Sequence, residues 1–495
     1  MEKILTARSY TLKDQLRFGR LSGDLNPLHT DPVKARREIY GGVIAHGANA
    51  VLCALEAYAA RIRKEGTASL AISNLGVSYP NPIYLNRKIT TYLAEERAGF
   101  ARLETWDREF QTKVLEMQFE WVPDAAGSGD DIPEGKTSGP LRPGRYTIEQ
   151  LKNKAGRIPL YLDRTGFAED FPVLSKILPG ATAGGILAIS RLAGMECPGA
   201  QSVCSSFKVD FSRTDRPIDF LGYRVIFADP RFSLVRMSLE SRWMSGTFDT
   251  FYRPMPVAQD SFEEVGRKVD ADEFRNISAL IIGGSRGLGE AAAKIIASGG
   301  GETVVTYNAG KEDADRVVAE ITAAGRICRT FRLDVSNPAK SISEIAAGGI
   351  LPTHIFYFPT PKIRIFKQMP FCRSVFDAFG AYYTAGLEKL YRAVRRAWPE
   401  RVLSLFYPST RCIDEPSEGC LEFAAAKAAG ETLCRALEKT DNNLSVYIAR
   451  LPWLATDRTL AFTARPAAGA SGVMLEIVRR MNAARPETKS ETKYI

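Results

Sequence analysis

The stretch Leu21-Ser22-Gly23-Asp24-Leu25-Asn26-Pro27-Leu28-His29-Thr30-Asp31-Pro32 carries more information about fold and chemistry than any other part of this chain. It places a carboxylate, Asp24, and an imidazole, His29, on one short segment rich in turn-forming residues. A second stretch, Gly41-Gly42-Val43-Ile44-Ala45-His46-Gly47, follows and leads into an apolar run. The chain has three histidines, and two of them lie in these stretches. Because histidine is the usual general base near neutral pH, the two stretches mark a candidate catalytic site.

Composition is that of a globular protein with several domains. The chain has 495 residues, of which 45% are hydrophobic and 25% charged, which is typical of about two to four domains. No apolar run is long enough to cross a bilayer, and the N-terminus lacks the apolar core of a signal peptide. The eight cysteines form no CxxC pair, which indicates reduced thiols. We therefore expect a cytoplasmic protein that does not engage a membrane.

The net charge of +9 is spread along the chain. Nucleic-acid binding would require a basic stripe with interleaved aromatic residues, and the sequence has none. A mildly positive surface suits an anionic partner such as coenzyme A or an acidic carrier protein. It equally suits a generic solvated surface, so both interpretations stay open, as does the formation of a homo-oligomer.

The first half of the chain divides into two segments of similar plan. A polar linker over 123–144, rich in Gly and Pro, separates residues 1–122 from residues 145–256. Each segment has an apolar helix that begins with glycine, expected over 41–62 and 180–193. Runs typical of strands follow, at 70–77, 88–94, 115–121, 203–211, 222–228 and 234–243. The pattern predicts two long helices wrapped by antiparallel strands, in a pseudo-symmetric pair packed side by side.

The third segment, residues 276–465, alternates strands and helices. Strands are expected at 277–282, 303–307, 328–335 and 354–358, and helices at 287–297 and 313–324. This βαβ alternation predicts an α/β Rossmann-type fold with a doubly wound parallel sheet.

Residues 1–122 closely resemble the MaoC-like, (R)-specific enoyl-CoA hydratases, which have the hotdog fold. The resemblance rests on the spacing of Asp24, Asn26, Pro27, His29 and Asp31, and on the downstream His46-Gly47. It implies an α+β double hotdog for the first two segments. It also implies Asp24 and His29 as the catalytic pair, and Gly47 as the backbone N–H donor to the thioester oxygen. No cofactor or metal is expected for this reaction.

The chemistry suits these residue types. Interconversion of a 3-hydroxyacyl and a 2-enoyl thioester moves a proton at Cα and a hydroxyl at Cβ, and one carboxylate with one imidazole can hold the water involved. Charge develops on the thioester oxygen, where an N–H at a helix start stabilises it.

The alternative is that Asp24 and Asn26 are only turn formers and that Asp31 caps a helix. We expect Asn26, Asp31 and His46 to be conformational. Leu55 stands where some relatives have a hydroxyl on the central helix, so we expect a polar contact to be missing there.

The run Ile282-Gly283-Gly284-Ser285-Arg286-Gly287-Leu288-Gly289 closely resembles the cofactor turn of short-chain dehydrogenases/reductases. Glycines between a strand and a helix let backbone amides approach a pyrophosphate. The resemblance implies cofactor-binding residues, namely Gly283, Ser285, Arg286, Gly287, Gly289, Asp334 and Lys427. Ser285 and Arg286 suit a 2′-phosphate, and no acid follows Tyr307, so NADP is favoured over NAD if a dinucleotide binds.

The catalytic residues of that family are incomplete in this chain. Its Tyr-x-x-x-Lys pair is represented by Phe423 and Lys427, and Phe423 has no ionisable proton. Tyr383 stands at the place of the family's helix asparagine, and Ser409 is retained. We therefore expect the fold to be kept and the hydride chemistry to be lost. In the alternative, a working reductase, Tyr383 would take the place of the family's catalytic tyrosine.

The sequence leaves three candidate functions. The first is a hydro-lyase that interconverts (R)-3-hydroxyacyl and trans-2-enoyl thioesters of coenzyme A or acyl carrier protein, in polyketide or fatty-acid-like biosynthesis, fused to an inactive reductase-like domain. The second is a bifunctional NADPH-dependent 3-ketoacyl reductase and dehydratase. The third is a non-catalytic acyl-binding scaffold subunit.

Overall fold

The computed structural model describes residues 3–122, 132–135, 142–212, 219–362, 371–416, 419–462 and 467–483. The chain forms two compact units, Met1–Met255 with Ala461–Ala464, and Pro256–Leu460 with Arg465–Ile495. Most of the expected linker, and the expected end of the third segment at 465, lie outside the described residues. No helix among the described residues is long and apolar enough to cross a membrane.

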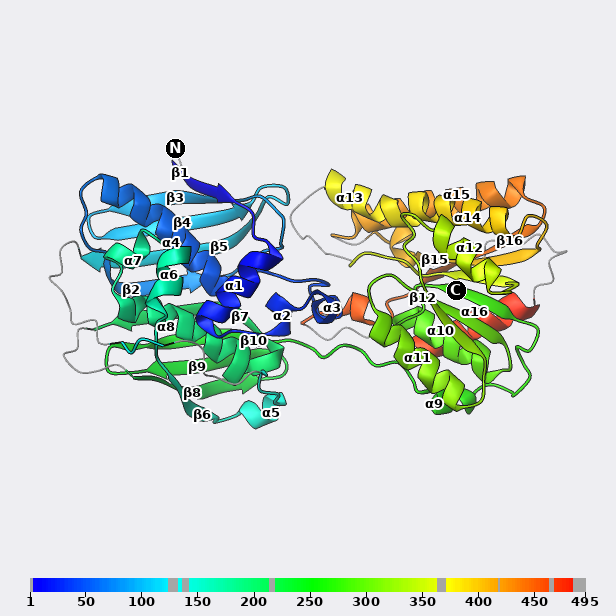
Figure 1. Cartoon of the computed structure of the whole chain (residues 1–495), viewed down its shortest axis with the longest axis horizontal. Coiled ribbons are helices and arrows are strands. Elements are labelled where there is room, and N and C mark those ends of the chain that lie inside the picture. The colour runs from blue at the N-terminus through cyan, green and yellow to red at the C-terminus, as the bar shows by residue number, and fades with distance from the viewer. Residues whose placement is uncertain are drawn as a thin grey trace. The chain divides into compact units, whose positions relative to one another are not determined.

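The first unit contains a ten-stranded antiparallel sheet with the order β1-β3-β4-β5-β2-β7-β10-β9-β8-β6 (Figure 1). Its strands are β1 (Lys3–Arg8), β2 (Ala71–Ser78), β3 (Ile89–Arg97), β4 (Phe100–Asp107), β5 (Thr112–Val122), β6 (Ala155–Pro159), β7 (Ser202–Phe211), β8 (Phe220–Asp229), β9 (Leu234–Glu240) and β10 (Met244–Tyr252). The order reads as two five-stranded halves in mirror sequence, joined where β2 pairs with β7 from Asn74↔Asp210 to Ser78↔Ser206. The sheet is therefore a pseudo-symmetric pair of hotdog repeats.

Each repeat has one long helix on the same face of this sheet, α4 (Gly47–Lys64) in the first and α8 (Gly180–Arg191) in the second (Figure 1). Their apolar side chains, such as Leu55 and Ile186, are fully buried in one shared hydrophobic core. Shorter helices connect them to the strands: α1 (Leu12–Ser22), α2 (Pro27–Thr30), α3 (Pro32–Ala35), α5 (Ile148–Leu151), α6 (Arg164–Asp170), α7 (Leu174–Ile177), η1 (Leu192–Glu196) and η2 (Gly199–Gln201).

The expectation that the first long helix begins at Gly41 is wrong, because α4 begins at Gly47. Gly41 has a positive φ of 66°, which a helix does not allow. Ile44 forms an isolated β-bridge with Tyr84, so the chain is not helical before α4. The strands β1, β4, β6 and β10 were not predicted either, because their mixture of charged and apolar residues hides the alternation that other strands show.

The second unit contains a six-stranded parallel sheet with the order β13-β12-β11-β14-β15-β16. Its strands are β11 (Ser278–Ile282), β12 (Glu302–Tyr307), β13 (Cys328–Arg332), β14 (His354–Tyr357), β15 (Leu403–Thr410) and β16 (Leu444–Leu451). Its helices are α9 (Phe262–Gly266), α10 (Gly287–Ser298), α11 (Lys311–Ala323), α12 (Ala339–Ala347), α13 (Arg373–Gly380), η3 (Ala381–Gly386), α14 (Leu387–Ala397), η4 (Arg411–Ile413), α15 (Leu421–Thr440), η5 (Asp457–Thr459) and α16 (Ala470–Ala483). This strand order is that of the Rossmann fold, and it confirms the predicted fold class.

Candidate active site

Three helix caps shape the segment that carries Asp24 and His29. Helix α1 ends at Gly23, whose φ of 79° turns the chain sharply. The side chain of Asn26 then caps α2 by accepting the N–H of Leu28 at 3.0 Å. Asp31 caps α3 through two backbone N–H groups. These local bonds bend the chain so that Asp24 and His29 face one place, which agrees with the conformational roles expected for Asn26 and Asp31.

The imidazole of His29 has a defined tautomer. Its Nδ1 lies 2.9 Å from the carbonyl oxygen of Ile44. Because a carbonyl oxygen can only accept, Nδ1 carries the hydrogen and Nε2 of the neutral ring keeps a free lone pair. Burial lowers the pKa of His29, with the negative charge of Asp24 opposing that effect. The side chain is thus a neutral base with one available nitrogen.

Asp24 is almost fully buried, with 3% of its surface exposed. Its Oδ1 accepts the N–H of Asn26 at 3.2 Å, and its Oδ2 accepts the hydroxyl of Ser190 at 2.8 Å. Burial raises the pKa of this carboxyl, while His29 and the bond from Ser190 lower it. One oxygen of Asp24 and one nitrogen of His29 lie within 4.8 Å of each other, so a single oxygen atom between them can contact both.

His46 joins the same cluster but has no free nitrogen. Its Nε2 donates to the carbonyl oxygen of Asp24 at 3.0 Å, and its Nδ1 lies 2.9 Å from Oε1 of Gln15. The ring is fully buried, which lowers its pKa well below the ordinary value. His46 therefore holds the backbone of the Asp24 loop.

Gly47 is the first residue of α4, where a backbone N–H has no partner within the helix. A Cβ atom at Gly47 would lie 2.7 Å from Cζ of Tyr79. The ring of Tyr79 therefore packs directly against the helix start, and only glycine fits under it. Nothing in the sequence singled out Tyr79, because it follows a strand without any recognisable motif.

The second repeat contributes more to this site than the sequence indicated. Ser190, at the end of α8, is 4% exposed and donates to Asp24. A Cβ at Gly194 would overlap Oδ1 of Asp24, so the carboxylate fits only because residue 194 is glycine. The amide of Asn26 donates to the carbonyl oxygens of Gly194 and Gly199 at 3.3 and 3.2 Å. Leu55 is fully buried, and whether a polar contact is missing there stays a prediction.

A buried ion pair lies beside the cluster. Arg253 is 1% exposed, pairs with the carboxylate of Glu38, and donates from Nε to the carbonyl oxygen of Ser202 at 3.1 Å. Its positive charge contributes to the lowered pKa of His29.

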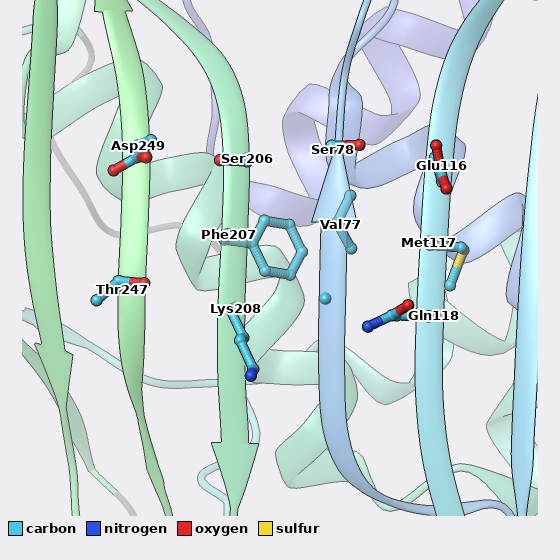
Figure 2. Close-up of a pocket in the computed structure, with 11 residues that line it drawn as sticks. Val77, Ser78, Glu116, Met117, Gln118, Ser206, Phe207, Lys208, Thr247 and Asp249 are labelled. Carbon is cyan, nitrogen blue, oxygen red and sulfur yellow. The ribbon is translucent and has the colours of Figure 1, made fainter.

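A shallow depression of about 290 Å³ lies elsewhere on the first unit, on the sheet face opposite α4 and α8 (Figure 2). Polar side chains from four strands line it, among them Glu116, Lys208 and Asp249. Glu116 pairs with Lys113, and Asp249 with Arg236. None of the expected catalytic residues lines the depression, and we interpret it as part of a solvated face.

In the second unit, the predicted glycine run forms the turn between β11 and α10. Gly283 and Gly287 have positive φ values of 79° and 59°. A Cβ at Gly289 would overlap the carbonyl oxygen of Gly283, so the helix start lies directly against the turn. The turn has the close backbone geometry of a phosphate-binding loop.

Two of the polar residues expected around that turn, Arg286 and Asp334, have other partners within the unit. Ser285 is buried at 7% exposed. Nη1 of Arg286 lies 3.4 Å from Oδ2 of Asp457. Oδ1 of Asp334 accepts the N–H of Ser336 at 2.8 Å. A role of these side chains toward a cofactor stays a prediction.

Lys427 is packed among aromatic rings. Its Nζ donates to the carbonyl oxygen of Pro408 at 2.5 Å and lies 3.9 Å from the ring centre of Tyr383. Burial lowers the pKa of Lys427 to about 7. The hydroxyl of Tyr383 bonds to Thr360, and Phe423 packs edge-on against the Tyr383 ring at 5.9 Å. Lys427 therefore lies over the face of this phenol ring.

The comparisons with known proteins match one segment in each half of the chain. Residues 2–115 match the family model described as MaoC like domain, and residues 278–348 match the short chain dehydrogenase family. Both resemblances drawn from the sequence are confirmed.

One relative and two solved structures show similarity to shorter parts of the chain. An uncharacterized oxidoreductase of Methylorubrum extorquens is 41% identical over 69 residues, which is 14% of this chain and 28% of that protein. A short chain dehydrogenase from Burkholderia cenocepacia, solved in complex with NADP, is 21% identical, with a TM-score of 0.37 over 42% of this chain and 91% of its own. A short-chain dehydrogenase/reductase from Serratia marcescens is 14% identical, with a TM-score of 0.40 over 45% and 97%.

Proposed function

We propose that this chain, which carries a MaoC-like dehydratase domain at its N-terminus and a short-chain dehydrogenase domain at its C-terminus, is a hydro-lyase. Its substrates are (R)-3-hydroxyacyl thioesters, which it dehydrates to trans-2-enoyl thioesters, and the reverse hydration uses the same site. The observation that carries the proposal is the pair of Asp24 and His29, which lie within 4.8 Å of each other, while the bond of Nδ1 to Ile44 leaves the lone pair of the neutral ring on Nε2 of His29.

The protonation states suit an elimination. Burial raises the pKa of Asp24 and lowers that of His29, which favours a neutral carboxylic acid beside a neutral imidazole, and we assign this form of the pair to the reaction. Nε2 of His29 removes the proton from Cα, and the electron pair of that C–H bond forms the new double bond. The C–O bond at Cβ breaks as Asp24 gives its proton to the leaving hydroxyl, which departs as water. A proton then returns from the imidazolium to the carboxylate.

The N–H of Gly47 is the donor that we assign to the thioester oxygen. Negative charge builds on this oxygen as the Cα proton leaves, and a donor at the start of α4 stabilises it together with the helix dipole. Such donors are typically worth ~10²–10³-fold in rate.

The acyl carrier is coenzyme A or an acyl carrier protein, in polyketide or fatty-acid-like biosynthesis. The net charge of +9 favours either anionic partner. Dehydration is the direction that we propose, because the ketoreductases that the second unit resembles form the 3-hydroxyacyl thioester that a dehydratase consumes.

We further propose that the second unit binds NADP without reducing a ketone. The glycine turn fits a pyrophosphate, because Gly283, Gly287 and Gly289 leave its backbone bare. Ser285 and Arg286 would hold the 2′-phosphate. When bound, a nicotinamide supplies hydride, but a carbonyl substrate also needs a proton donor, and Phe423 has none. Burial raises the pKa of Tyr383, which makes that phenol a poor acid.

The experiment is incubation of the full chain with a panel of 3-hydroxyacyl thioesters on coenzyme A and on carrier protein. Loss of one water by mass spectrometry is the expected result, with the (R) isomers as substrates. His29→Gln is expected to abolish turnover, and His354→Gln, which changes the histidine of the second unit, serves as the matched control. A wild-type chain that turns over no member of the panel would contradict the proposal.

A parallel arm tests the second unit. NADPH is added together with 3-ketoacyl thioesters, and its fluorescence and absorbance are followed. Binding without oxidation is expected. Oxidation that is lost in Lys427→Ala would instead support the bifunctional reductase and dehydratase.

A further inference from the structure

The carboxylate of Asp24 is held by a residue of the other repeat. Ser190 lies on α8, 166 positions further along the chain, and its Oγ is 2.8 Å from Oδ2 of Asp24. Both side chains are buried, with 4% and 3% of their surfaces exposed. Because water has little access to either group, this bond has no solvent competitor.

The direction of the Ser190 hydroxyl is unusual for a helical serine. Such a hydroxyl commonly donates back to a carbonyl of the preceding turn, as Ser298 of α10 does to Ile295 at 2.9 Å. The Ser190 hydroxyl donates across the repeats to Asp24 instead. After Arg191 the helix continues into the π-helical turn η1, a feature that is frequent at functional sites.

The same turn of the second repeat closes around the other carboxylate oxygen. Gly194 in η1 leaves room for Oδ1 of Asp24, where a Cβ would overlap it. The carbonyl oxygen of Gly194 also accepts from the amide of Asn26. The carboxylate is thus enclosed by the second repeat from two sides, and Ser190 is the one donor that this repeat directs at it among the described residues.

We infer that Ser190 is a positioning residue for the dehydration, which orients the Asp24 carboxyl toward the substrate and stabilises it after it has given up its proton. This inference rests on the proposed function of the Asp24–His29 pair. It assigns the second repeat, which has no acid–base pair of its own, an essential part in the reaction of the first.

Several titratable groups face the same carboxyl. His29 comes from α2, His46 caps α4, and Cys204 lies on β7, while Arg253 acts on His29. Burial raises the pKa of Asp24, and the bond from Ser190 opposes that rise. Removal of the hydroxyl should therefore make the carboxyl harder to ionise and leave the other groups in place.

The test compares Ser190→Ala with the wild-type chain and with Ser298→Ala, which removes an equally buried helical hydroxyl from the second unit. We expect kcat for dehydration to fall roughly ten- to a hundred-fold in Ser190→Ala, since a hydrogen bond to a charged group is lost. The alkaline limb of the pH–rate profile, where Asp24 loses its proton, should also move to higher pH. Ser298→Ala should change neither quantity.

Ser190→Thr and Ser190→Val separate this role from a packing role. The two side chains have nearly the same shape, and only threonine keeps a hydroxyl. Rescue of rate and pH profile by threonine, but not by valine, supports the inference. If both variants keep the same kcat as each other and the pH–rate profile of the wild type, the inference is wrong. If the wild-type chain shows no turnover, the proposed function itself is wrong.

Discussion

The carbonyl oxygen of Ile44 lies 2.9 Å from Nδ1 of His29. This one contact decides which nitrogen of the imidazole is basic, because the carbonyl keeps the hydrogen on Nδ1. Ile44 can make it because it lies in a β-bridge with Tyr84, ahead of helix α4. A helix over residues 41–46, as the sequence suggested, would have directed the carbonyl into its own hydrogen-bond ladder.

The pH dependence of dehydration should be a narrow bell. The active pair holds one proton, and burial raises the pKa of Asp24 while it lowers that of His29. Activity therefore falls at low pH as His29 gains a second proton, and at higher pH as Asp24 loses the shared one. The acidic limb should lie below pH 6.5, the ordinary value for histidine. A profile of kcat/KM measures both limbs, and an acidic limb above pH 6.5 would contradict the assignment.

Asp24→Asn should lower kcat by ~10²–10⁴-fold, the usual worth of a positioned acid or base. Asparagine keeps the shape and can still accept from Ser190, but it cannot give a proton to the leaving hydroxyl. Asp210→Asn, on the exposed pairing of β2 with β7, is the matched control. Single-turnover measurements check the effect, and a loss below tenfold would speak against acid catalysis by Asp24.

Gly47→Ala should slow the reaction because the new methyl group meets the ring of Tyr79 at 2.7 Å. Either the ring or the helix start must then move, and the N–H of residue 47 moves with the helix. Tyr79→Ala frees the space that the new methyl group needs. Gly47→Ala should therefore lower kcat less in the Tyr79→Ala background than in the wild type. A double-mutant cycle in kcat measures this coupling. Strictly additive effects would show that the two residues act independently.

Acid should destabilise the first unit through His46. The pKa of this buried ring is far below its ordinary value of 6.5. Above pH 6.5 neither the folded nor the unfolded ring is protonated. Below pH 6.5, the unfolded chain binds a proton at this ring that the folded chain does not bind. The free energy of unfolding therefore decreases as the pH is lowered. Calorimetry between pH 5 and 8 should show a weaker decline in His46→Asn than in the wild type, and an identical decline would refute the neutral state of His46.

Lys427 should make the second unit more stable as the pH rises. Its pKa is lowered from 10.5 to about 7, so above pH 7 the unfolded chain binds a proton that the folded chain has lost. Stability then rises by about 1.4 kcal/mol per pH unit from this group. Urea unfolding at pH 7 and 8.5 should show the increment in the wild type and not in Lys427→Met. Parallel pH responses of the two proteins would mean that the folded lysine is charged.

The proximity of Asp24 and His29 could be predicted because it is encoded over few residues. Asp24 and His29 share one short segment, and the turns that Gly23, Asn26 and Asp31 impose bring them to the same place. The glycine turn at 283–289 is equally local. Ser190 and Tyr79 could not be predicted, because a lone serine in an apolar helix and a lone tyrosine after a strand carry no signal of their own.

The sequence by itself determined the two fold classes, the Asp24–His29 pair and the loss of the reductase tyrosine at Phe423, since each is written in residue types at short spacing. Only the tertiary structure decided which nitrogen of His29 is free, that α4 begins at Gly47, and that Ser190 and Gly194 of the second repeat enclose the carboxylate. The physical reason is that these depend on hydrogen bonds and close contacts between groups far apart in the chain. Such contacts form only when β2 pairs with β7 and both long helices share one core.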